Sequence, residues 1–267
     1  MSKLHQISPG EKVDLSQFTT RGKDLHDDRK SAEKEFAAYR QRIAELQPRL
    51  YAERKQKLLI VLQAMDAGGK DSTTRHVFEG VNPQGVHVVS FKAPSSRELA
   101  HDYLWRIHQA VPPKGMIHIF NRSHYEDVLV VRVDQLIPEN EWQRRYDQIN
   151  QFEKFLTETG TKILKFYLHI SKEEQKERFQ DRLDEPEKHW KFSKEDLEKR
   201  KQWDEYRVAF NDALTECSTE HAPWHVIPAD QKWYRNWAIS KIIFETLEEM
   251  NPQFPAEEPG LDKIVIE

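Results

Sequence analysis

The sequence lacks several features that would mark a secreted, membrane-bound or metal-cluster protein. Its 267 residues include one cysteine, Cys217, which excludes a disulfide framework and a metal site made of several cysteines. The longest aliphatic run, residues 58–62, is far too short to span a membrane, and residues 1–17 lack the apolar core of a signal peptide. We therefore expect a cytoplasmic protein that has no membrane partner.

The sequence also lacks an excess of basic charge. Lys and Arg number 41 and Asp and Glu number 45, which gives a net charge of -4. This balance argues against a polycation that coats nucleic acid, so we expect no nucleic-acid partner, although a local basic site remains compatible with it. The aromatic content, with 7 Trp, 8 Tyr and 13 Phe, is too high for a disordered chain.

Hydrophobic periodicity predicts an α/β fold with a parallel sheet and helices on both faces. Apolar residues recur at three- and four-residue steps between residues 27 and 57, which indicates a helix. Short apolar runs predict strands over residues 58–62, 86–91, 116–120, 163–170 and 224–228. Helical patterns cover residues 71–79, 96–110, 139–159, 172–183, 194–217 and 233–250.

Residues 64–72, called the phosphate loop below, connect the first predicted strand to a helix. They resemble the pattern G-x-x-x-x-G-K-[ST], but Ala64 replaces the first glycine and Asp71 replaces the Ser or Thr, with Ser72 one place later. Gly68 and Gly69 would let backbone amides turn toward an anion, and Lys70 would add a positive charge. An ordinary glycine-containing turn is the alternative interpretation.

Asp66 is unusual in such a loop, because a carboxylate repels phosphate. At 4 Å and an effective dielectric constant of 20, that repulsion is about 4 kcal/mol. The residue makes sense if it faces Mg²⁺ or the phosphate group of an acceptor, rather than the phosphate held by the loop.

A second group of polar residues follows the third predicted strand. Asn121 and Arg122 should lie beside the phosphate loop, because ligands bind beyond the carboxyl ends of parallel strands. Arg122 can contact phosphate through a bidentate fork, and Glu126 and Asp127 offer hard oxygen ligands for Mg²⁺. We expect His124 to be a hydrogen-bonded structural residue.

The charged stretch at residues 172–207 has few aliphatic residues and a helix break at Pro186. It is either a solvated helical hairpin or a mobile lid, about residues 180–205, over a phosphate site. Arg178 and Arg182 lie four residues apart on one helix face. They either pair with Glu174 and Asp181 at the surface or form an arginine clamp for phosphate.

Four ordered segments resemble the polyphosphate kinase 2 family. They are residues 63–71 (QAMDAGGKD), 103–106 (YLWR), 120–128 (FNRSHYEDV) and 190–192 (WKF). The resemblance covers about residues 30–255 and implies a P-loop kinase fold similar to thymidylate kinase, with a helical lid. On this basis we expect an N-terminal arm (residues 1–25), a single kinase domain (26–255) and a C-terminal tail (256–267).

The resemblance also implies an activity: transfer of the terminal phosphoryl group of inorganic polyphosphate to a nucleotide, with Mg²⁺ or Mn²⁺. Asp66, Lys70, Arg122 and Arg182 match the catalytic residues of the family. The loop residues Ala67, Gly68, Gly69, Lys70, Asp71 and Ser72, together with Arg178, would bind phosphate. Asn121 stands where the family commonly has an Asp, so Asp66 and Asp127 are the expected metal ligands.

The segment His124-Tyr125-Glu126-Asp127 resembles the class III subgroup, which phosphorylates both AMP and ADP. Glu126 is the expected determinant of acceptor choice, with adenine or guanine nucleotides as substrates. The resemblance also leads us to expect a homo-oligomer, a dimer or a tetramer. Candidates for a basic polyphosphate channel are Arg75, Lys92, Arg106 and Arg132.

Two alternatives remain open at this point. The first is an ATP-dependent nucleoside monophosphate kinase on the same fold. The second is a non-catalytic sensor that binds polyphosphate or a nucleotide without turnover.

Overall fold

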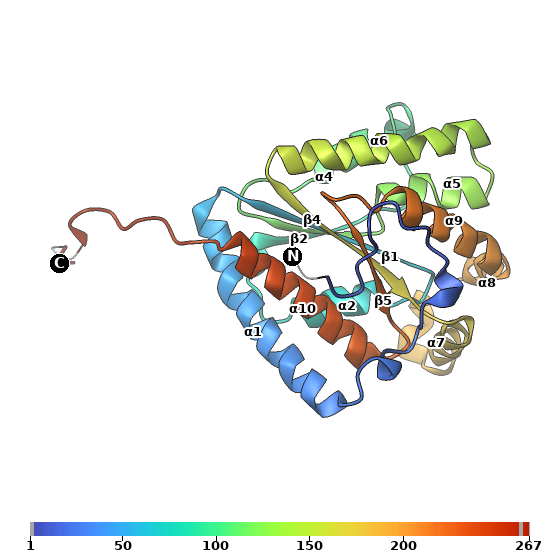
Figure 1. The fold of residues 1–267 in the computed structure, drawn as a ribbon, viewed down its shortest axis with the longest axis horizontal. Coiled ribbons are helices and arrows are strands. Elements are labelled where there is room, and N and C mark those ends of the chain that lie inside the picture. The colour runs from blue at the N-terminus through green and yellow to red at the C-terminus, as the bar shows by residue number, and fades with distance from the viewer. Residues whose placement is uncertain (1–2, 262–263, 267) are drawn as a thin grey trace.

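A computed structural model, which describes residues 3–261 and 264–266, has a five-stranded sheet at its centre (Figure 1). The strands are β1 (Lys57–Ala64), β2 (Val86–Ser90), β3 (Ile117–Asn121), β4 (Thr161–His169) and β5 (Trp224–Pro228). Their order in the sheet is β2-β3-β1-β4-β5, and all neighbouring strands are parallel. The predicted α/β fold with a parallel sheet is confirmed.

Strand β1 lies in the middle of the sheet. Its residues pair with β3 on one side and β4 on the other, and every residue from Leu58 to Ala64 is buried. An apolar run without alternation is the expected pattern for a strand that is covered on both faces. The phosphate loop therefore begins at the carboxyl end of the most central strand.

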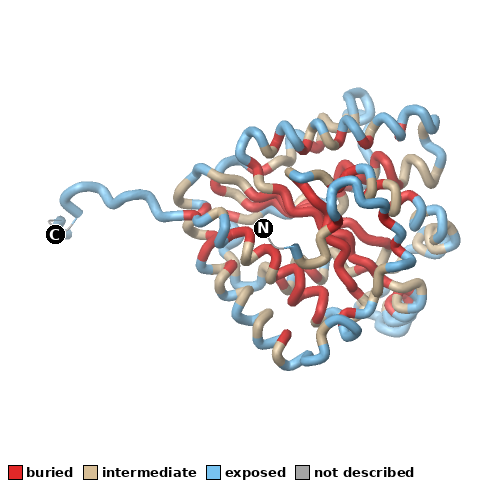
Figure 2. Tube along the Cα trace, in the orientation of Figure 1, coloured by how far each residue is buried: buried red, intermediate tan, exposed pale blue. Residues whose placement is uncertain are grey.

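Helices cover both faces of the sheet, as Figure 1 shows, and the buried residues concentrate between them (Figure 2). One face carries α1 (Arg29–Glu53), α2 (Lys70–Val77) and α10 (Lys232–Met250), which packs against both of the others. The other face carries α6 (Glu139–Glu158), α9 (Trp203–Glu216) and the short helices α4 (Trp105–Ala110) and α5 (Val130–Val133). Helices α7 (Lys172–Asp184) and α8 (Lys194–Lys201) lie at one end of the molecule.

Two predicted helices are each divided into two, which corrects the sequence-based boundaries. The segment 96–110 contains α3 (Ser96–Leu99) and α4, because the Asp102 side chain accepts a hydrogen bond from the Leu104 amide and starts a new turn. The segment 194–217 is interrupted at Gln202. Helix α8 buries no side chain, whereas α9 packs four residues into the core, so the two parts follow different surfaces.

The N-terminal segment lies against the edge strand β5. The Ile7 N–H donates to the Trp224 carbonyl at 2.8 Å, and the Val226 N–H donates to the His5 carbonyl at 2.9 Å, so one antiparallel bridge extends the sheet.

At the C-terminal end, residues 251–261 and 264–266 extend away from the domain (Figure 1). Residues 1–2 of the expected arm and residues 262–263 and 267 of the expected tail lie outside the described residues. In the part of the chain that is described, no helix is both long and apolar enough to cross a membrane.

The connections of β1 and β3 leave the sheet in opposite directions. The chain passes from β1 through α2 to β2 on one side, and from β3 through α5 and α6 to β4 on the other side. Such a reversal opens a crevice at the carboxyl ends of the two strands, where ligands bind in doubly wound sheets. The phosphate loop and Arg122 flank this crevice.

A buried ionic cluster supports the segment that follows β3. Lys165 on β4 donates to the Glu153 carboxylate at 2.6 Å, to the Tyr125 hydroxyl at 2.8 Å and to the Cys217 carbonyl at 2.6 Å. His124 lies 3.1 Å from the same carboxylate, which confirms it as a hydrogen-bonded structural residue. Burial by itself would raise the pKa of Glu153, but the charges of Lys165 and His124 hold that pKa below its usual value.

Lys165→Met should lower the free energy of unfolding by about 3 to 5 kcal/mol, because it leaves the Glu153 carboxylate buried without its counter-charge. Lys162→Met on the same strand is the control: Lys162 is partly exposed, its ion pair with Glu249 spans 3.6 Å, and the change should cost about 1 kcal/mol or less. Urea unfolding measures both. A loss at Lys165 no larger than the loss at Lys162 would contradict the importance of the cluster.

Candidate functional site

The phosphate loop has the backbone of a tight, strained turn. Ala67 and Gly69 have positive φ angles of 59° and 101°. A side chain at Gly68 would lie 2.4 Å from the Cβ of Ala64, so glycine is required there by packing. Left-handed conformations at non-glycine residues cluster at functional sites, and Ala67 is one of them.

Lys70 begins α2 and turns its side chain back toward the end of β1. Its Nζ donates to the Ala64 carbonyl at 3.1 Å. Burial lowers the pKa of Lys70, and the nearby charge of Arg122 acts in the same direction. The ammonium group is therefore poorly solvated in the crevice, where an anion would stabilise it.

Asp66 and Arg122 form an ion pair across the crevice between β1 and β3. Arg122 Nη2 donates to Asp66 Oδ1 at 2.9 Å, and Arg122 itself has a positive φ of 63°, which marks a second strained residue at the site. The guanidinium offsets the repulsion between the Asp66 carboxylate and phosphate. Next to this pair, the Asn121 side chain donates to the Asp71 carboxylate, so Asn121 supports the first turn of α2.

A cavity at this edge of the sheet, called the basic cleft below, measures about 540 Å³. It is lined by the phosphate loop, the first turn of α10 and the residues of α7 and its following turn. Its basic residues outnumber its acidic ones: Lys70, Lys92, Arg122, Arg178, Arg182, Lys188, Lys191, Lys232 and Arg235 against Asp66, Asp71, Asp181 and Asp196. A cleft of this charge fits a polyanion.

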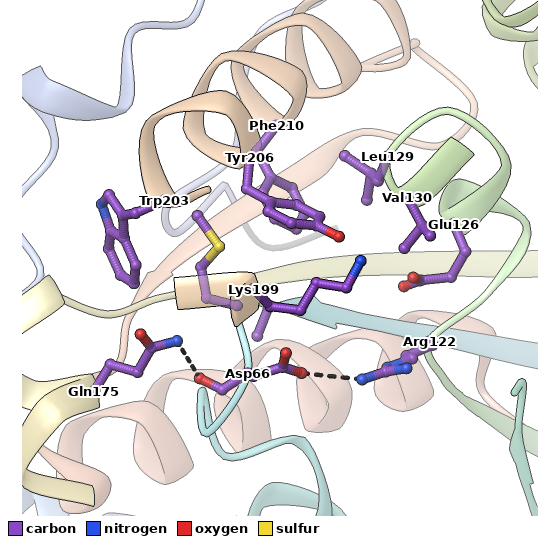
Figure 3. Close-up of a pocket in the computed structure, with 12 residues that line it drawn as sticks. Asp66, Arg122, Glu126, Leu129, Val130, Gln175, Lys199, Trp203, Tyr206 and Phe210 are labelled. Carbon is purple, nitrogen blue, oxygen red and sulfur yellow. Dashed lines mark hydrogen bonds and ion pairs between the residues drawn. The ribbon is translucent and has the colours of Figure 1, made fainter. Parts of the chain in front are cut away.

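The second cavity, called the aromatic cavity below, is smaller and has a different lining (Figure 3). Trp203, Tyr206 and Phe210 from α9 form one wall, and Leu129 and Val130 form another. Polar side chains form the remaining wall: Asp66, Arg122, Glu126, Gln175 and Lys199. An apolar pocket with a few polar groups is typical of a small-molecule site, and the aromatic rings offer faces on which a planar ring can stack.

The two cavities meet at Asp66 and Arg122, which line both of them. The ion pair therefore separates a basic cleft that fits a phosphate chain from an aromatic cavity that fits a planar ring. A group bound in one cavity can therefore lie next to a group bound in the other at this pair.

Glu126 points into the aromatic cavity (Figure 3). With the Gln63 amide oriented to satisfy both of its neighbours, Gln63 donates to the Glu126 carboxylate at 3.0 Å and accepts from Ser123 Oγ at 3.1 Å. Burial raises the pKa of Glu126, although the positive charges of Arg122 and Lys70 oppose that effect.

Asp127, the other expected metal ligand, does not line a cavity that Asp66 lines. Its carboxylate is 3.1 Å from Arg145 and 3.8 Å from Arg106, and it lines neither cavity. A carboxylate that already faces two guanidinium groups is poorly placed to bind a cation. The structure therefore does not support Asp127 as a metal ligand, whereas the Asp66 carboxylate lines both cavities.

Arg178 and Arg182 have different surroundings although they share one helix face. Arg178 is buried and donates to the carbonyls of Ala67 and Ala229 at 2.8 and 2.6 Å, so it holds the phosphate loop against α7. It also pairs with Glu174 at 2.7 Å, but this pair is not at the surface. Arg182 lines the basic cleft, where its guanidinium donates to the Lys191 carbonyl at 3.0 Å.

Some of the residues predicted for the polyphosphate channel lie at the basic cleft, and others do not. Lys92 lines the basic cleft, and Arg106 donates to the Lys92 carbonyl at 2.8 Å from a neighbouring cavity. Arg132 pairs with Asp212 at 2.6 Å, and neither Arg132 nor Arg75 lines the cleft. Four basic residues of the cleft were not predicted: Lys188, Lys191, Lys232 and Arg235. Nothing in the local sequence pattern of α10 distinguishes Arg235 from a surface arginine.

The described residues contain no group of three or more His, Cys, Asp or Glu side chains that could hold a metal ion by themselves. This is compatible with Mg²⁺, which proteins commonly bind through one or two carboxylates together with phosphate oxygens of the substrate. Asp66, at the junction of the two cavities, is the carboxylate that fits this mode.

Comparison with known proteins gives a consistent result. The family model described as Polyphosphate kinase 2 (PPK2) matches residues 26–255. The chain is 54% identical to the AMP/ADP-polyphosphate phosphotransferase of Meiothermus ruber, over 99% of this chain and 100% of that protein. It is 41% identical to the ADP-polyphosphate phosphotransferase of Rhodopseudomonas palustris, over 100% of this chain and 96% of that protein. The crystal structure of Polyphosphate Kinase 2 from Arthrobacter aurescens superimposes with a TM-score of 0.92 at 41% identity, covering 97% and 93% of the two chains.

Gly69→Ala should destabilise the protein more than Gly80→Ala does. Both glycines have positive φ, 101° and 87°, so both variants incur the cost of a left-handed alanine, about 1 to 2 kcal/mol. Only at Gly69 would the new Cβ meet another atom, Arg235 Nη1 at 2.0 Å, whereas nothing lies within 4 Å at Gly80. We expect an additional loss of about 1 kcal/mol or more in urea unfolding. Equal losses would mean that Arg235 does not restrict the loop.

Proposed function

The chain belongs to the polyphosphate kinase 2 family and is a polyphosphate-dependent nucleotide kinase, and we propose that it phosphorylates both AMP and ADP. The observation that supports transfer from a phosphate chain to a nucleotide is the position of Asp66 and Arg122 at the junction of the two cavities. The full-length relative from Meiothermus ruber, whose name includes both acceptors, supports the dual specificity.

The two substrates take the cavities that match their chemistry. The basic cleft takes the polyphosphate chain, whose every unit carries negative charge. The aromatic cavity takes the base of the nucleotide, with Tyr206, Phe210 or Trp203 as stacking partners. The acceptor phosphate then lies near Asp66 and Arg122, next to the terminal phosphoryl group in the loop.

Phosphoryl transfer in this arrangement needs positioning and charge stabilisation, and it needs no protein nucleophile. An acceptor phosphate oxygen attacks the terminal phosphorus in line, and the bond to the next phosphate of the chain breaks. Lys70 and the loop amides hold the donor, and Arg122 and Arg182 neutralise charge on the transferring group. A bound divalent cation, which we propose to be Mg²⁺ or Mn²⁺, supplies further charge neutralisation, and Asp66 would hold it.

The direct test is product analysis after incubation with polyphosphate, Mg²⁺ and either AMP or ADP, in the absence of ATP. We expect ADP and ATP from AMP, and ATP from ADP, with loss of turnover in EDTA and recovery with Mg²⁺. Lys70→Ala should lower kcat by on the order of 100-fold, with folding intact. Phosphorylation only with ATP as donor would instead indicate an ordinary nucleotide kinase, and binding without turnover would indicate a sensor.

Glu126→Asn should reduce phosphorylation of AMP more than phosphorylation of ADP. AMP lacks the β-phosphate, and the Glu126 carboxylate in the aromatic cavity can hold a cation or water in its place. Loss of such a charge-assisted contact corresponds to on the order of 10-fold in kcat/KM for AMP, with a smaller effect for ADP. An equal decrease for both acceptors would make Glu126 a general site residue.

The lid, proposed to comprise residues 180–205, should become ordered when both substrates bind. No residue from 180 to 208 is buried, so few apolar contacts hold this segment in place. Hydrogen exchange of the lid should slow with AMP and tripolyphosphate, while exchange of α6, which lines neither cavity, should not change.

Arg182→Lys tests the same closure in kinetics. The variant keeps the charge but loses the guanidinium fork, so kcat should fall, on the order of 10-fold, more than KM rises. Unchanged exchange together with unchanged kcat would identify the segment as a rigid solvated hairpin.

A further inference from the structure

Arg235, in the first turn of α10, is completely buried beneath the phosphate loop, with a relative exposure of 0%. Arginine is almost never fully buried unless an acidic group pairs with it. Yet Arg235 forms no ion pair with any residue that the structure describes, unlike Arg122, Arg132 and Arg178. The mechanism outlined above does not use it.

The hydrogen bonds of Arg235 involve neutral groups only. Nε and Nη2 donate to the Asn236 side-chain oxygen at 3.2 and 2.9 Å, and Nη2 also donates to Ser72 Oγ at 3.2 Å. Nη1 is buried and has no hydrogen-bond partner among the described residues. One end of the guanidinium is therefore anchored, and the other end lacks an acceptor.

The end without an acceptor faces the phosphate loop. A Cβ placed on Gly69 would lie 2.0 Å from Nη1, so this nitrogen lies directly against the glycine, where no side chain separates it from the loop. Arg235 is also one of the residues that line the basic cleft. Arg178 Nη1 approaches the same glycine, at 3.5 Å from the same added Cβ.

The surrounding charges leave Arg235 without compensation. Among the described residues, two charged groups act on it: Arg178, which repels it, and Glu174, which is itself paired with Arg178 at 2.7 Å. Burial, together with the charge of Arg178, lowers the pKa of Arg235 to about 9, so the group is still charged at neutral pH. A buried charge without a partner is costly, and a ligand that supplies the opposite charge would remove that cost.

We propose that Arg235 favours phosphate binding through its charge, from beneath the loop, and that its missing counter-charge is the phosphate group held over Gly68 and Gly69. This inference rests on the proposed function, because it assigns the ligand to the phosphoanhydride chain in the basic cleft. Arg178 differs from Arg235, because its donors are occupied by the carbonyls of Ala67 and Ala229 and by the Glu174 carboxylate. Arg178 shapes the loop, whereas Arg235 provides an uncompensated charge beneath it.

A phosphate-related role and a purely structural role for Arg235 predict different effects when its charge is removed. If Arg235 served only to hold Ser72 and Asn236 by hydrogen bonds, removing its charge would destabilise the ligand-free protein and leave ligand affinity unchanged. If phosphate is its counter-charge, removing the charge leaves the ligand-free protein equally stable or more stable, and weakens binding.

The experiment is a calorimetric titration of inorganic tripolyphosphate, with Tm measured with and without it. Arg235→Met removes the charge, and Arg235→Gln removes the charge but can still hydrogen-bond Ser72. Arg132→Met is the matched control, because Arg132 is a partly buried arginine with its own carboxylate partner and lines neither cavity. No turnover is needed for any of these measurements.

We expect both Arg235 variants to keep or exceed the Tm of the ligand-free wild type, to bind tripolyphosphate on the order of 10-fold or more weakly, and to lose most of the ligand-induced rise in Tm. Arg132→Met should show the opposite pattern, a lower Tm with unchanged affinity. Wild-type affinity in a folded Arg235 variant would overturn the inference. Failure of both variants to fold would overturn it too, because the fold would then need the charge. If the wild type itself does not bind tripolyphosphate, the proposed function fails instead.

Discussion

The ion pair between Asp66 and Arg122 is the interaction on which the organisation of the site depends. It joins the loop after β1 to the residue after β3, at 2.9 Å, where the chain connections of the two strands diverge. The strand order puts these two loops side by side, and the positive φ of Arg122 accompanies its approach to Asp66. The pair neutralises a carboxylate that would otherwise repel phosphate, and it forms the shared wall of a basic cleft and an aromatic cavity.

Around this pair, the protein holds more positive charge than the fold requires. Some of that charge is used internally: Arg178 donates to the Ala67 carbonyl of the loop, and Lys165 compensates Glu153 beneath the segment after β3. Lys70 and Arg235 line the basic cleft and form no ion pair with any described carboxylate, and Arg182 lines it while paired with Asp196 at 3.4 Å. Positive groups in this site are poorly solvated, so a bound polyanion would stabilise them. Binding of the polyanion is therefore coupled to the stability of the loop and of the lid.

The sequence predicted the fold well because the patterns that indicate strands and helices each extend over a few neighbouring residues. The apolar run at 58–62 identified a strand buried on both faces, residues 224–228 were predicted with the bounds of β5, and the alternation of elements gave the parallel sheet. The helix boundaries at 96–110 and 194–217 were wrong because an Asp102 turn and a change of packing surface at Gln202 interrupt a continuous helical pattern. Resemblance to a family supplied the expected activity, which the full-length relatives support.

The sequence by itself determined the fold class, the family and the phosphate loop, because neighbouring residues or ordered motifs are enough to recognise each of them. Only the tertiary structure decided which side chains share the site. Glu126 and Asp127 are adjacent in the chain, yet Glu126 lines the aromatic cavity and Asp127 faces Arg145 and Arg106. Arg235 lies 163 residues from Ser72, and its contact with the loop depends on how α10 packs against α2. Whether a charge is compensated depends on the groups that lie close to it in space. A sequence pattern therefore shows that a charge is present, but not whether another group already balances it.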